Sequence, residues 1–107
     1  MNQRRVKIEE MLLAEPNDEF LRYSLALEKQ KDGELEPALA LLSSLCGGDK
    51  PYVAAFFRSA QWLAEISKIE EARAFLRDGI DAARQQGDLH AAAEMGEMLS
   101  DLGEMGE

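Results

Sequence analysis

Residues of the types that carry chemistry are few in this sequence, and one group of them has a helical spacing. His90 and Glu94 lie four positions apart, and Glu97 follows three positions later. Residues three and four positions apart lie on one face of an α-helix. The spacing is therefore that of a weak metal site or of an acid–base pair. It is also typical of a solvated helix surface, which is the simpler interpretation.

A second candidate for chemistry is Cys46, which stands directly before Gly47-Gly48. A reactive thiol needs a lowered pKa, and nothing in the neighbouring sequence suggests one, so a small buried hydrophobe is the favoured reading. The glycine pair lacks the Gly-Lys-Ser pattern of a phosphate-binding loop, and no Gly-x-Ser-x-Gly occurs. One histidine and one cysteine are too few for a Cys/His zinc site. We expect no catalytic residue, no metal ligand and no cofactor, and therefore no enzyme.

Length and charge narrow the remaining classes. The chain has 107 residues, the size of one domain, and 12 Lys and Arg against 21 Asp and Glu give a net charge of −9. This charge balance argues against nucleic-acid binding and against attraction to an anionic membrane surface. The sequence has neither a membrane-length apolar run nor an apolar signal segment after its basic start. A single cysteine makes no internal disulfide, which predicts a cytoplasmic protein.

An internal repeat of 34 residues organises the chain. Shifted by 34 positions, residues 35–42 align with residues 69–76, and four of the eight pairs are identical. The same shift places Ala26 on Ala60 and Tyr23 on Phe57. A fixed period of this length is the signature of a repeat architecture, in which each unit runs from one proline-bearing turn to the next.

The apolar spacing within each unit is helical. We predict six helices and no strand. The first spans 2–14, the second carries Leu21, Leu25 and Ala26 and ends near Gly33, and the others span 35–45, 53–66, 69–84 and 89–102. Gly33 suits a left-handed helix end. Ser67 takes the equivalent place in the second unit with less backbone freedom. Asp88 is the expected cap of the last helix, and another turn is expected at Gly103.

Small residues recur at equivalent places in these helices. Ala26, Ala60 and Gly96 form one set, and Ala38 and Ala72 form another. Small side chains at fixed spacing let helices approach closely, so each helical pair can stack on the next as a short solenoid. A generic six-helix bundle is the alternative, but it does not require matched turns at a 34-residue period.

The repeat resembles the tetratricopeptide repeat of small bacterial-type proteins. Residues 33–38 resemble its inter-helix turn, Leu25-Ala26 its small-residue pair, and Pro16 and Pro51 its terminal proline; the likeness covers about residues 16–103. It implies an all-α, right-handed solenoid of about six antiparallel helices. The implied parts are an N-terminal capping helix at 1–15, full repeats at 18–50 and 51–86, and a half-repeat at 88–107.

The resemblance also implies a function, namely binding of a partner peptide or helix in a concave groove lined by the first helix of each unit. The groove residues would be Phe20, Tyr23, Leu27, Gln30, Phe57, Arg58, Gln61, Glu65, His90 and Glu94. Some members of the family hold the carboxylate tail of a chaperone with paired cations and amides. Those places carry Tyr23, Leu27 and Glu94 here, and only Arg58 is cationic, so we expect no such docking.

The two ends of the chain suggest an alternative function. Residues 88–107 contain six acidic residues and no Lys or Arg, whereas Arg4, Arg5 and Lys7 make the other end basic. Methionine side chains form adaptable contact surfaces. Self-association through the ends would therefore use Met95, Met98, Leu99 and Met105. The alternative to a peptide-binding module is thus a structural homo-oligomer or assembly subunit.

Overall fold

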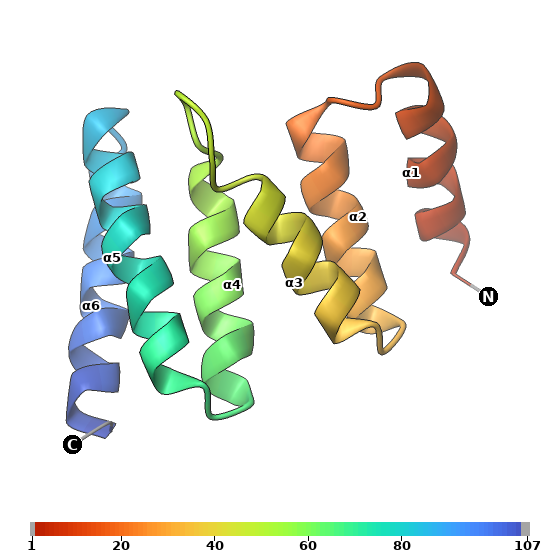
Figure 1. Ribbon diagram of the computed structural model, residues 1–107. Coiled ribbons are helices and arrows are strands. Elements are labelled where there is room, and N and C mark those ends of the chain that lie inside the picture. The colour runs from red at the N-terminus through yellow and green to blue at the C-terminus, as the bar shows by residue number, and fades with distance from the viewer. Residues whose placement is uncertain (1, 106–107) are drawn as a thin grey trace. The chain divides into compact units, whose positions relative to one another are not determined.

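The chain folds into helices and turns over the residues that the structure describes. The structure is a computed structural model and describes residues 2–105, with side chains from Asn2 to Gly103. Over that range lie six helices: α1 (Gln3–Ala14), α2 (Glu19–Lys31), α3 (Leu35–Ser44), α4 (Val53–Glu65), α5 (Ile69–Gln85) and α6 (Leu89–Met105) (Figure 1). No strand occurs among these residues, and the predicted all-α fold is confirmed.

Local sequence accounts for the starts of α1, α2 and α6. The side chains of Asn2, Asp18 and Asp88 accept hydrogen bonds from backbone amides three residues later, at 3.0, 2.9 and 3.1 Å, as N-caps do. The prediction of a turn at Gly103 was wrong, because α6 continues to Met105. Leu102 is buried, and its burial outweighs the cost of a helical glycine, about 1 kcal/mol.

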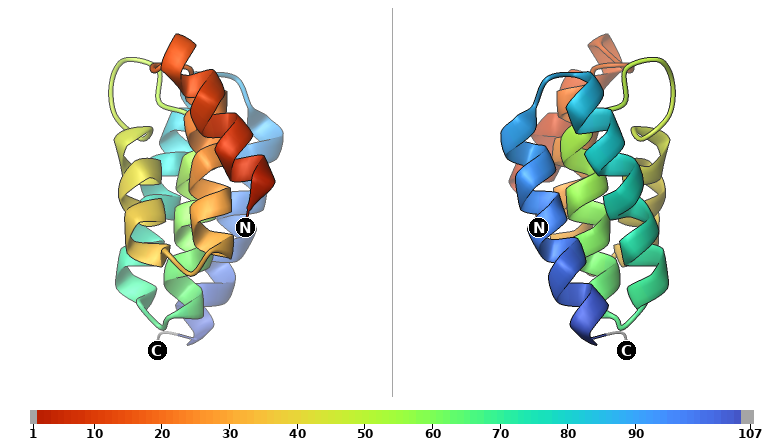
Figure 2. Two further views of the ribbon diagram at one scale, coloured as in Figure 1. Left: turned by 90° about the vertical axis from the view of Figure 1, so that its right-hand side faces the viewer. Right: turned by 90° about the vertical axis from the view of Figure 1, so that its left-hand side faces the viewer.

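The helices form two compact units, residues 1–45 and residues 46–107. In the first unit, α2 packs against both α1 and α3. In the second unit, α5 packs against both α4 and α6 and runs antiparallel to each of them (Figure 2). The boundaries of the two expected repeats, 18–50 and 51–86, stay a prediction.

Helices approach closely where side chains are small. Ala26 and Ala38 in the first unit and Ala60 and Ala72 in the second are fully buried. Both neighbouring helices approach α5 closely at Gly79, because a Cβ atom there would lie 2.6 Å from the Cβ of Phe56 and 2.6 Å from the sulfur of Met95. A side chain at Gly79 is therefore excluded by α4 on one side and α6 on the other.

The expected role of Gly96 as a contact point was wrong. A Cβ atom built on Gly96 would meet no atom within 4 Å, and the residue before it, Met95, is fully buried instead. The inward face of α6 consists of Ala92, Met95 and Leu102, which are spaced three and seven residues apart. Packing of this stripe against the unit rotates Gly96 away from the contact.

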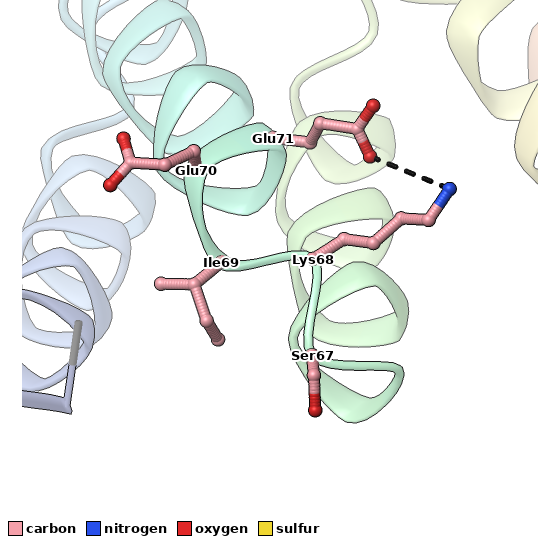
Figure 3. Close-up of a pocket in the computed structure, with 5 residues that line it drawn as sticks. All are labelled: Ser67, Lys68, Ile69, Glu70 and Glu71. Atoms are coloured by element: carbon pink, nitrogen blue, oxygen red, sulfur yellow. Dashed lines mark ion pairs between the residues drawn. The ribbon is translucent and has the colours of Figure 1, made fainter.

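Three turns share one geometry. Gly33, Ser67 and Gly87 have φ angles of +83°, +63° and +77°, and the amide after each donates to the carbonyl five residues before that amide, at 2.8–2.9 Å. This is the Schellman helix end, whose left-handed residue is normally glycine. Ser67 holds that conformation with a side chain present, as shown at the α4–α5 turn in Figure 3.

Helix α1 is held mainly by polar contacts, since Ile8 is its only buried residue among those described. Arg5 donates to Asp32 at 3.0 Å and to Glu34, and the Asn2 amide donates to Glu28 at 3.1 Å. We call Asn2, Arg5, Glu28, Asp32 and Glu34 the N-terminal polar cluster. It joins α1 to the end of α2 and to the turn that follows.

The carboxylates of this cluster are stabilised in their charged form. The hydrogen bond from Asn2 lowers the pKa of Glu28, whose side chain is 5% exposed. Hydrogen bonds from Arg5 lower the pKa of Asp32 and of Glu34. Since a lowered pKa means that the unfolded chain binds more protons, the cluster stabilises the fold above the ordinary pKa values and loses this effect on acidification.

Substitutions of two helical glycines, Gly79 and Gly96, should have opposite effects on stability. Gly79→Ala forces a Cβ into Phe56 and Met95 and should lower the free energy of unfolding by about 1–3 kcal/mol. Gly96→Ala fills open space in a helix and should raise it by about 0.5–1 kcal/mol. Urea unfolding followed by the fluorescence of Trp62, the single tryptophan, measures both. Equal effects of the two changes would contradict the packing at Gly79.

Replacement of Ser67, whose backbone is held in the left-handed conformation, should stabilise the second unit. Ser67→Gly should raise the free energy of unfolding by about 0.5–1 kcal/mol, because glycine adopts this backbone conformation without steric cost. The matched control, Gly87→Ala, should lower it by about 1 kcal/mol for the converse reason. The same Trp62 fluorescence applies. A neutral Ser67→Gly change would show that the turn relaxes to another geometry.

Removal of the Arg5 guanidinium should make the first unit less sensitive to acid. In the unchanged protein, stability of α1 should fall as the pH drops below 4.5 and 3.8, the ordinary values for Glu and Asp. Arg5→Gln should lose most of that dependence, because Arg5 is the chief cause of both lowered pKa values. Amide hydrogen exchange of α1 at pH 7 and at pH 3.5 tests this. Arg77→Gln, on exposed α5 surface, is the control and should behave as the unchanged protein does.

Candidate functional site

The residues considered for chemistry do not form a reactive centre in the structure. The side chain of His90 is 87% exposed, and its Nε2 atom lies 3.2 Å from Glu94 Oε1 on the next turn of α6. Among the described residues no three His, Cys, Asp or Glu side chains are grouped so as to hold a metal ion. The arrangement is that of a solvated helix surface.

Cys46 lies half-buried at the start of the second unit. Burial raises the pKa of its thiol to about 12, and the charge of Asp78 adds to the shift. At neutral pH the thiol is therefore protonated, whereas the thiolate is the nucleophilic form. Cys46 lines a hollow with Phe56 of α4 and with Phe75 and other residues of α5. The burial of the thiol there opposes reactivity, because it disfavours the thiolate.

A hollow between α4 and α6 brings together part of the predicted groove. Phe57 and Gln61 line it from α4, four residues apart, and Glu94 lines it from α6. The predicted self-association residue Met98 lies in the same hollow, with Glu97 and Asp101. We call the lining residues Phe57, Gln61, Glu94, Glu97, Met98 and Asp101 the acidic hollow.

Helix periodicity explains how the acidic hollow is built. The opposite side of α4 is buried in the core, which leaves Phe57 and Gln61 on its outer side. On α6, Glu94, Glu97 and Asp101 are spaced three and four residues apart and so share one side of the helix. Asp101 was not predicted as a site residue, although this spacing is visible in the sequence. An aromatic ring and a thioether edged by three carboxylates suit a ligand with apolar and cationic groups.

The other predicted groove residues lie elsewhere. Arg58 of α4 is half-buried and Glu65 is exposed at the end of the same helix. Tyr23, Leu27 and Gln30 are half-buried along α2 in the first unit. Phe20 lies one turn before Tyr23 on the same side of α2, and it is 64% exposed.

Phe20 belongs to a hollow between α1 and α2 that was not predicted from the sequence. Its lining comprises Gln3, Arg4, Lys7, Ile8 and Met11 of α1 with Phe20, Leu21 and Ser24 of α2, and we call this set the basic groove. Arg4 also lies 3.3 Å from the buried carboxylate of Glu28. The available signal was the spacing of Arg4, Lys7 and Met11 at three and four residues on one helix side.

The expected self-association residues are only partly at the surface. Met95 must be corrected, because its side chain is fully buried against α5 at Gly79 and takes no part in any external contact. Met98 and Leu99 are half-buried. The side chain of Met105 lies outside the described residues.

The turn between α4 and α5 carries a further hollow, lined by five successive residues, 67–71. Lys68 Nζ lies 3.9 Å from Glu71 Oε2 on one side of it, and Glu70 points to the other side (Figure 3). All five side chains come from a single exposed turn. The hollow therefore lacks the second element that a binding site would need to fix a ligand.

None of the helices in the described part of the chain combines the length and the apolar character that crossing a bilayer requires.

Comparison with known proteins agrees with the helix arrangement. No family model and no curated protein matches the sequence. Among solved structures, a tetratricopeptide repeat domain protein from Salinibacter ruber, determined by solution NMR, superimposes with a TM-score of 0.76 at 28% identity. The match covers 81% of this chain and 88% of that one. With paired helices, left-handed turns and small contact residues repeated along the chain, the fold is of the tetratricopeptide repeat type.

Proposed function

We propose that the chain is a non-enzymatic interaction module that binds a peptide or helix of a partner protein in the acidic hollow. The tetratricopeptide repeat fold supports a protein-interaction role in general. The observation that carries the choice of surface is the grouping of Phe57 and Met98 with three carboxylates between α4 and α6. Aromatic side chains at the centre of a contact supply most of its binding energy.

The chemistry of the acidic hollow defines the partner segment. Glu94, Glu97 and Asp101 attract Lys or Arg, and they disfavour acidic sequences by like-charge repulsion. Phe57 and Met98 offer apolar area to an aliphatic or aromatic side chain. A short segment in which cationic and apolar residues alternate in helical spacing satisfies both requirements, so the expected ligand is a basic amphipathic peptide.

Loss of Phe57 or Asp101 should weaken such binding. Peptides selected from a random display library on the unchanged protein should be enriched in Lys and Arg beside apolar residues. Phe57→Ala and Asp101→Asn should each raise the Kd of the selected peptides by about tenfold, as removal of a central contact does. Isothermal titration calorimetry measures the Kd values, and circular dichroism confirms that each variant stays folded.

Two matched variants control for surface changes of the same kind. Leu89→Ala removes an exposed apolar side chain from α6, and Asp81→Asn removes a carboxylate from α5; neither residue lines the acidic hollow. Both should leave the Kd values unchanged. Selected peptides that bind Phe57→Ala and Asp101→Asn as tightly as the unchanged protein would place the binding surface elsewhere.

A further inference from the structure

The two hollows at opposite ends of the sequence carry opposite charge. The basic groove of the first unit presents Arg4 and Lys7 at the edge of an apolar floor that includes Met11 and Phe20. The acidic hollow of the second unit presents three carboxylates beside Phe57 and Met98. Each surface therefore combines exposed apolar area with charges that the other surface complements.

The acidic net charge of the chain favours contacts that use the basic groove over contacts between other surfaces of two copies. The net charge is −9, so two copies that meet at random surfaces repel each other. The repulsion is strongest for residues 88–107, which contain six acidic residues and no Lys or Arg. A basic groove is the kind of surface on which that acidic end meets attraction instead.

Apolar exposure gives the contact a source of affinity beyond charge. Phe20 is 64% exposed and Met11 48% exposed, and both line the basic groove. Aromatic and methionine side chains are enriched at protein interfaces, where their burial supplies affinity. Lys7 and Asp101 make no ion pair with other described residues, so neither must break an existing pair to form a new one.

We propose that the basic groove of one copy docks the acidic hollow of a second copy, head to tail. The proposal rests on the proposed function, since it uses the same acidic hollow and names the basic amphipathic partner as the α1–α2 surface of another copy. The contact joins two different surfaces, so it generates either an open chain of copies or a closed ring. In both cases the mass should rise above that of the monomer as concentration increases.

Sedimentation velocity across a concentration series tests the assembly, because it reports the weight-average mass. The unchanged protein should show a mass that rises above that of the monomer as concentration increases. Lys7→Glu in the groove and Asp101→Lys in the hollow should each shift the concentration needed for association upward by tenfold or more. The controls are Arg77→Glu and Asp81→Lys, which produce the same net charges on exposed parts of α5 and should associate as the unchanged protein does.

Mixing the two variants provides the sharper test. In an equimolar mixture, Glu at position 7 of one copy faces Lys at position 101 of the other, and the natural pair of Lys7 and Asp101 forms at the alternate junction. The mixture should regain association that neither variant shows alone. A change of ionic strength alone does not test the docking contact, because salt weakens both the attraction between groove and hollow and the repulsion between acidic copies.

Two results would overturn the proposal: a protein that stays monomeric at millimolar concentration, or a variant mixture that fails to associate. Failure of the proposed function is a separate result, because it shows as peptide Kd values insensitive to Phe57. A strictly monomeric protein whose selected peptides still depend on Phe57 would reject self-docking and leave the peptide site standing.

Discussion

The second unit depends on one constraint, which is the space left open by the missing side chain of Gly79. Phe56 of α4 and Met95 of α6 both fill that space, and both are buried because of it. A methyl group there would hold either helix away from α5 and expose the apolar area that binds them together. Because Phe57 and Met98 are tied to these helices, the width of the acidic hollow follows from the same contact.

The 34-residue period predicted the positions of turns as well as those of helices. Gly33 and Ser67, 34 positions apart, take the same left-handed conformation, and Ala26 and Ala60 are buried alike. The prediction was wrong in α6, where the spacing between equivalent residues changes from 34 to 36. There Met95 rather than Gly96 faces inward, because the burial of a large side chain outweighs the likeness of two small ones.

The candidate site was predictable only where its residues share a helix or an equivalent place in the repeat. Phe57 and Gln61 lie one turn apart and Glu94 takes an equivalent place in the next unit, so the resemblance to the tetratricopeptide repeat implied all three. Phe20 meets Lys7 and Met11 only through the packing of α2 against α1. Contacts of that kind depend on how two helices cross, which a periodicity on either helix alone does not specify.

The contacts that attach α1 to α2 connect the stability of the first unit with the integrity of the basic groove. A helix with one buried residue gains little from apolar burial, so the N-terminal polar cluster must supply much of what holds it. Arg5 and Asn2 provide those bonds, while Lys7 and Met11 of the same helix remain turned to the basic groove. Conditions that protonate Asp32 and Glu34 loosen α1 and with it one wall of the groove. Acidification therefore weakens the support of the groove independently of the charge on a ligand.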